Sequence, residues 1–177
     1  MLTTIAEVSQ RLVDSAVEIY ETDDRLLLKQ GRVLVQTSDG SVVSCWAFLL
    51  SDVLLLTMTR PELPTDAEPD EETRFRVIHM AHMCDTVVDE RPAAVAAFAQ
   101  PALSHSFLVI DRETRQMLKL APLSGFLRRE WTRAIAAAAY DEVVRYHDTR
   151  HCRHCAGTKL THCVCVCVCV CVCVCVC

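Results

Sequence analysis

The sequence predicts an α+β fold, in which an antiparallel barrel of about seven strands is closed by one long C-terminal helix. Short apolar runs separated by turn residues extend over residues 26–121. A helical period of apolar residues starts at residue 124, and another precedes the first strand. Many short strands followed by a single helix favour a barrel that the helix covers on one side.

An amphipathic helix is predicted first, over residues 3–22. Apolar side chains recur there at positions 5, 8, 12, 16 and 20, with acidic residues and glutamine between them. This spacing places the apolar side chains on one face of a helix. The polar residues 21–24 end the element.

A meander of strands follows, with runs over residues 26–36, 42–50 and 53–58. Asp39-Gly40 lies between the first two runs and favours a tight hairpin, because glycine tolerates the positive φ of such turns. After an acidic loop over residues 61–72, apolar residues from 75 to 88 supply one or two strands. Residues 89–105 are interpreted as an irregular connection with at most one helical turn at 93–99. Residues 106–110 and 116–121 form a second hairpin.

The closing helix is predicted over residues 124–146, with Ser124 as its N-cap. Its apolar stripe contains Leu127, Trp131 and Ile135, and Trp131 is expected to anchor the helix against the sheet. Strands of a small barrel bury alternate side chains, and the helix fills the open corner. The predicted core therefore consists of Phe48, Leu50, Leu55, Phe107, Leu118, Leu120, Leu127, Trp131 and Ile135.

Length and composition indicate one folded domain, since the chain has 177 residues of which 51% are hydrophobic and 23% charged. The formal net charge of −5 provides no basic excess for a nucleic acid, so no nucleic-acid partner is expected. The N-terminus lacks the basic start and apolar run of a signal peptide. We therefore expect a cytosolic protein in which Cys45 and Cys84 stay reduced.

Several segments resemble pleckstrin homology (PH) domains. Lys29-Gln30-Gly31 is similar to the opening of the first PH strand, and CWAFLLSDVLLL at 45–56 is similar to the second and third strands. SFLVI at 106–110 and LKLA at 118–121 resemble the last two strands, and LRREWTRAI at 127–135 resembles the closing helix. The resemblance covers residues 26–146 and implies a PH-type barrel.

The second hairpin, FLLSDVLL at 48–55, is most similar to PH domains that follow the Dbl-homology (DH) domain of Rho guanine-nucleotide exchange factors. That resemblance implies the end of a DH domain in residues 1–24 and a PH domain in 25–147. It implies a non-catalytic module in the cytoplasm, peripheral at membranes. Its partners would be a Rho-family GTPase or a DH domain, and weakly an anionic membrane. The alternative is a stand-alone PH adaptor that binds phosphoinositides or proteins.

Phosphoinositide-binding PH domains use basic residues on the first strands, because inositol phosphates need several cationic donors. The corresponding candidates are Lys29 and Arg32, with Arg74 and Arg76 after the acidic loop. Residues 33–59 contain no Lys, Arg or His, and Cys45 stands where the family often has an arginine. Solvated surface charge is the plainer interpretation of these residues, and weak, unselective membrane binding is expected.

No catalytic motif, metal site or cofactor site is predicted. The sequence lacks a nucleophile elbow and a P-loop. His79 and His82 are expected to point to opposite faces of a strand, which prevents a shared metal site with Cys84. Cys152 and Cys155 have the spacing of half a zinc site, but alternating Cys and Val residues follow. Residues 148–177 are therefore interpreted as a low-complexity tail, translated from a TGTGTG repeat at the end of a fragmentary gene prediction.

Overall fold

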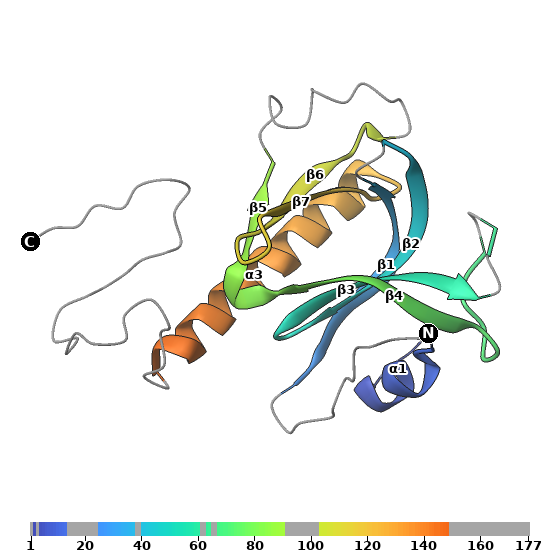
Figure 1. Ribbon diagram of the computed structural model, residues 1–177, viewed down its shortest axis with the longest axis horizontal. Coiled ribbons are helices and arrows are strands. Elements are labelled where there is room, and N and C mark those ends of the chain that lie inside the picture. Colours follow the sequence, from blue (N-terminus) through green and yellow to red (C-terminus); the bar gives the residue numbers. More distant parts are fainter. Residues whose placement is uncertain are drawn as a thin grey trace, which may run out of the picture.

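The computed structural model describes residues 2, 4–13, 25–37, 40–60, 63–64, 67–90 and 103–148, with side chains described as far as residue 145. It contains a short N-terminal helix, seven strands, one 3₁₀ turn and a long C-terminal helix (Figure 1). In chain order these are α1 (Ile5–Arg11), β1 (Leu27–Gln36), β2 (Val42–Leu50), β3 (Val53–Arg60), β4 (Arg74–His82), η1 (Met83–Asp85), β5 (Thr86–Asp89), β6 (Phe107–Asp111), β7 (Gln116–Ala121) and α3 (Gly125–Asp148).

The seven strands form one antiparallel sheet in the order β4-β3-β2-β1-β7-β6-β5. Strand β1 joins the two halves of this sheet: it pairs with β2 along its length, but with β7 only through Leu34, Val35 and Gln36. Helix α3 lies across the sheet on the side of β5, β6 and β7 (Figure 1). The predicted α+β architecture and its strand order along the chain are confirmed.

The turns and the cap of α3 form at residues whose side chains favour them. Gly40, in the β1–β2 turn, has a φ of 85°, and its N–H donates to the carbonyl of Thr37. In the β6–β7 turn, one carboxylate oxygen of Asp111 accepts the N–H groups of Glu113 and Thr114 at 2.9 and 3.1 Å. The Ser124 hydroxyl accepts the N–H of Leu127 at 3.2 Å, which confirms Ser124 as the cap of α3.

One apolar cluster fills the barrel interior. Its side chains come from β1 to β3, from β6 and β7, and from α3. Trp131 is 1% exposed and lies in this cluster with Ile135, Phe107 and Leu120. Leu118 and Leu127 are only partly buried and pack against it. The anchoring position predicted for Trp131 is thus confirmed, since its ring is buried among side chains from β1, β2, β6 and β7.

A second apolar cluster lies on the other side of strands β2 and β3. Phe48, Leu50 and Leu55 are buried as predicted, but they belong to this second cluster with Phe75 and not to the cluster around Trp131. Successive residues of a strand point to opposite faces, so Ala47, Leu49, Leu54 and Leu56 take the interior positions instead. Both faces of this hairpin are therefore buried.

Helix α1 covers the second cluster and is shorter than predicted. It begins with a capping box, in which Thr4 and Glu7 exchange hydrogen bonds, and it buries Ile5 and Val8. The predicted helix over residues 3–22 is interrupted at Leu12, which is extended and forms an isolated bridge with Phe75. The N–H of Val13 donates to the carbonyl of Phe75 at 2.9 Å, so strand-like pairing replaces the helix at these two residues.

Some predictions lie outside the described residues. These are the second half of the N-terminal helix, the helical turn at 93–99 and the low-complexity tail. Among the residues that are described, no helix is long and apolar enough to cross a membrane.

Candidate functional site

Lys29 and Arg32, the two basic candidates on β1, each lie beside a tryptophan ring. The Lys29 Nζ lies 5.5 Å from the ring centroid of Trp131 and 3.7 Å from a carboxylate oxygen of Glu130. The Arg32 guanidinium lies 6.0 Å from the ring centroid of Trp46 and donates to the Ser44 hydroxyl at 3.0 Å. Both cations are thus engaged by neighbouring side chains of the same chain.

The other two candidates lie elsewhere on the sheet. Arg74 is exposed, and its Nη1 donates to the carbonyls of Glu71 and Glu72 at 3.0 and 3.1 Å. Arg76 places its Nη2 3.9 Å from the sulfur of Met58 on the neighbouring strand. The structure therefore brings Lys29 and Arg32 to one groove, as described next, while Arg74 and Arg76 do not line it.

This groove has a volume of about 470 Å³ and runs between α1, the first half of β1, the loop before β4 and the start of α3. Both tryptophans of the chain, Trp46 and Trp131, line it. Its rim carries charges of both signs, and Leu123 and Leu127 close its end at α3. We call this cavity the β1 groove.

Two arginines hold the acidic loop as one wall of the β1 groove. Arg32 donates to the carbonyl oxygen of Ala67, and Arg11 of α1 donates to that of Asp70. Neither arginine forms an ion pair with a carboxylate of the described part of this loop. Glu68 and Glu71 line the groove, are exposed, and form no ion pair or hydrogen bond through their carboxylates within the described part of the chain.

Asp70 stabilises the same wall from within the loop. Its Oδ1 accepts hydrogen bonds from the hydroxyl and the N–H of Thr73 at 2.7 and 2.9 Å, and from the N–H of Glu72 at 3.1 Å. These hydrogen bonds favour the carboxylate form and lower the pKa of Asp70. The sequence showed the acidic run, but not that β1 and α1 would bind its backbone.

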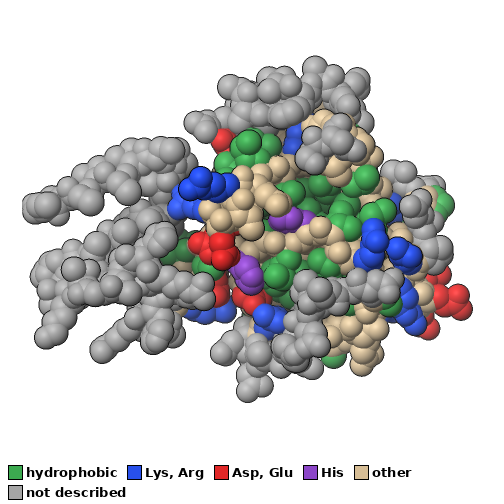
Figure 2. Space-filling model, in the orientation of Figure 1, with side chains coloured by type: hydrophobic (Ala, Val, Ile, Leu, Met, Phe, Trp, Pro, Cys, Tyr) green, Lys and Arg blue, Asp and Glu red, His purple; other side chains and the backbone are tan. Residues whose placement is uncertain are grey.

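Charges of opposite sign are mixed over much of the described surface. On the face that Figure 2 shows, acidic and basic side chains lie close to each other at both ends of the described part. Beyond the groove, Arg25 forms a two-pronged ion pair with Asp52 in the β2–β3 turn, with Nε 2.9 and 3.0 Å from the two carboxylate oxygens. Mixed charge of this kind offers little attraction to a densely anionic headgroup.

The two described cysteines are not reactive centres. Burial raises the pKa of the Cys45 thiol to about 12. Burial, followed by the hydrogen bond to Asp85, raises the pKa of Cys84 to about 12 as well. A thiol reacts as its thiolate, so both are inert near neutral pH. Neither cysteine forms a disulfide in the described part of the chain.

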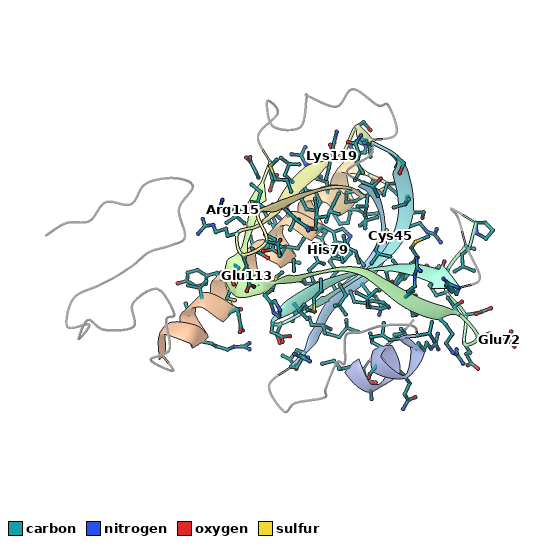
Figure 3. The ribbon with its side chains drawn as sticks, viewed as in Figure 1. Cys45, Glu72, His79, Glu113, Arg115 and Lys119 are labelled. Atoms are coloured by element: carbon teal, nitrogen blue, oxygen red, sulfur yellow. The ribbon has the colours of Figure 1, made fainter. Side chains whose placement is uncertain are left out.

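His79 is a half-buried residue of β4 (Figure 3). Burial lowers its pKa, and the charge of Asp111 opposes that shift. His82, on the same strand, is exposed. Within the described residues, no group of three or more His, Cys, Asp or Glu side chains has the arrangement of a metal site.

No family model matches the chain, and no curated protein matches it. Solved structures do match. The apo structure of an activated truncation of Vav1 has a TM-score of 0.55 at 15% identity, covering 76% of this chain and 31% of that one. The linker-DH/PH fragment of p115-RhoGEF has a TM-score of 0.54 at 17% identity, covering 77% and 38%. Human RhoA in complex with the DH/PH fragment of PDZRhoGEF has a TM-score of 0.53 at 14% identity, covering 77% and 38%.

The fold is that of a PH domain, with seven antiparallel strands and a C-terminal helix that packs on the sheet. Two of these structures are described as DH/PH fragments, those of p115-RhoGEF and PDZRhoGEF. At these identities the likeness establishes the fold alone. The chain spans about a third of the length of the structures it matches.

Proposed function

We propose that this chain is the non-catalytic PH module of a Rho-family guanine-nucleotide exchange factor. In this role it supports a DH domain and contacts a protein or membrane surface from the cytoplasm. The observation that carries the proposal is the match to the DH/PH fragments of p115-RhoGEF and PDZRhoGEF, with TM-scores of 0.54 and 0.53, together with the match to an activated truncation of Vav1 at 0.55. The FLLSDVLL hairpin at 48–55 supports it from the sequence.

The charges of β1 favour protein contact over lipid recruitment. A headgroup site needs several cations that converge and are available, whereas Lys29 is engaged by Glu130 and Arg32 by Ser44. Each basic residue near an anionic membrane contributes about 1 kcal/mol, so two cations give weak attraction. A protein partner therefore supplies most of the binding energy in this proposal.

The test is the identity and activity of the endogenous protein. An antibody raised against the full chain is used for immunoprecipitation, and the product is sequenced by mass spectrometry and assayed for release of labelled GDP from RhoA. We expect peptides of a DH domain in the same polypeptide and accelerated release. Antibody blocked with the purified chain is the control. A protein of the chain's own size that leaves GDP release unchanged contradicts the proposal.

The adaptor alternative is favoured by one observation, which is that Lys29 and Arg32 line the same groove. Vesicles with and without one phosphoinositide, titrated at physiological salt, test it. Under the exchange-factor proposal, binding is weak and similar for all phosphoinositides. Submicromolar binding to one phosphoinositide that Lys29→Ala abolishes, while the control Arg133→Ala on the exposed side of α3 does not, establishes the adaptor.

A further inference from the structure

The first half of β1 is an open strand edge inside the β1 groove. β1 pairs with β7 only from Leu34 onward, so in the described chain no strand lies beside the preceding residues on that side. Lys29, Gln30 and Gly31 from this half line the groove. A strand edge presents unpaired N–H and C=O groups, which an extended peptide can pair with.

Apolar and aromatic side chains border this edge. Trp131 and Trp46 lie on either side of β1, and a Cβ added at Gly31 would lie 3.7 Å from the Trp131 ring. The Trp46 residue is 9% exposed, and its indole N–H is buried without a hydrogen-bond partner among the described residues. Buried donors are nearly always paired in folded proteins, so this one favours an acceptor that is supplied from outside.

The charged side chains that line the groove favour a basic occupant. The groove cations Arg11 and Arg32 already bind backbone oxygens, and Lys29 lies beside Glu130. The carboxylates of Glu68 and Glu71 remain on the rim without such partners in the described chain. An occupant with basic side chains complements them, whereas an acidic one is repelled.

From these observations we propose that the β1 groove binds a short, extended, basic peptide segment of a partner protein. The peptide adds as a strand to the open edge of β1, its apolar side chains lie against the tryptophans, and its basic side chains pair with Glu68 and Glu71. Part of the groove wall is α1, which lies in the segment that the resemblance assigns to the end of a DH domain. The test measures binding to this chain alone, so its outcome does not depend on whether the chain belongs to an exchange factor.

The test uses the full chain and a fluorescein-labelled probe of eight residues that alternates arginine and valine. Binding is followed by anisotropy and by the intrinsic fluorescence of the chain, since both of its tryptophans line the groove. We expect saturable micromolar binding with a change in tryptophan emission. Absence of binding at 100 times that concentration overturns the proposal.

Two double variants distinguish binding in the β1 groove from a general attraction between the basic probe and the acidic chain. Glu68→Gln with Glu71→Gln removes the unpaired rim carboxylates, and we expect about five- to tenfold weaker binding. Glu72→Gln with Glu113→Gln makes the same change in net charge outside the groove, because Glu72 lies at the tip of its loop and Glu113 in the β6–β7 turn (Figure 3). Equal losses in the two double variants contradict a specific site.

Two methylated probes test strand pairing. N-methylation of every second residue removes N–H donors from one edge of an extended peptide only. One isomer should therefore lose about tenfold or more in affinity, while the isomer methylated on the other edge binds like the parent probe. Equal binding of both isomers overturns strand addition. Co-sedimentation of the chain with anionic vesicles in the absence of probe, lost in Lys29→Ala, identifies the groove as a membrane site instead and also overturns the proposal.

Discussion

The side chain of Trp131 anchors α3 against the barrel. It is 1% exposed, it packs against both halves of the sheet, and Lys29 lies over its ring. Trp131→Ala should lower the free energy of unfolding by about 3–5 kcal/mol, because it removes buried apolar surface and leaves a cavity. Urea unfolding measures the loss. The control is Phe126→Ala on the same helix, where the side chain is 63% exposed and the change should stay within about 0.5 kcal/mol.

His79 makes stability depend on pH in the mildly acidic range. Burial lowers its pKa below the ordinary histidine value of about 6.5, so the unfolded chain binds a proton at a pH where the folded chain does not. Stability attributable to His79 is therefore complete above about pH 6.5 and falls as the pH drops toward the lowered pKa of the folded state. We expect His79→Gln to reduce the loss of stability between pH 7.5 and 5.5, measured by urea unfolding.

The matched control for this prediction is His82→Gln, on the same strand and exposed. It should show the same loss between the two pH values as the unchanged protein. If His79→Gln also loses as much stability as the unchanged protein, burial of His79 does not contribute to the pH dependence.

At the scale of an element, α1 covers the second apolar cluster. Val8 has no exposed surface and packs with Ile5 in the cluster of Phe48 and Phe75, whose rings meet edge to face at 5.0 Å. Val8→Ala should cost about 1.5–3 kcal/mol in urea unfolding, from lost burial and the cavity left behind. Gln10→Ala, exposed on the same helix, should change stability by no more than about 0.5 kcal/mol. Equal stabilities of the two variants would show that α1 is not part of the folded core.

At the scale of the whole molecule, the apolar clusters formed by the described residues end before the Cys-Val repeat begins. Every side chain in the two apolar clusters lies at or before Ala138. A chain that ends after Asp148 should therefore keep its melting temperature within about 2 °C of that of the full chain. A decrease of about 5 °C or more would mean that the removed residues contribute to the fold.

The same truncation should remove disulfide-linked oligomers that form in air. Cys45 and Cys84 both have a pKa near 12 and react slowly, whereas the other ten of the 12 cysteines lie beyond residue 148. Non-reducing electrophoresis compares the two chains, and Cys84→Ser in the full chain is the control that should still form oligomers. Oligomers that persist after truncation would show that one of the two core thiols is reactive.

The order of the strands along the chain and the position of the closing helix were predictable because both depend on local signals. Asp39-Gly40 and Ser124 act within a few residues, and the alternation of apolar residues sets each strand. The end of α1 was not predictable. The apolar spacing continues to residue 20, but Leu12 pairs with Phe75, and a contact across such a distance in the chain has no signature in the local sequence.

By itself the sequence determined the α+β class, the number of strands and the anchoring role of Trp131, because the hydrophobic period and the turn residues are local properties of the chain. Only the tertiary structure decided which face of each strand is interior. The hairpin at 42–60 is apolar on both faces, so its pattern is compatible with either assignment until α1 covers one of them. The tertiary structure also decided that Arg32 and Arg11 bind the acidic loop. That contact creates the β1 groove, and it joins segments whose proximity depends on the folded barrel.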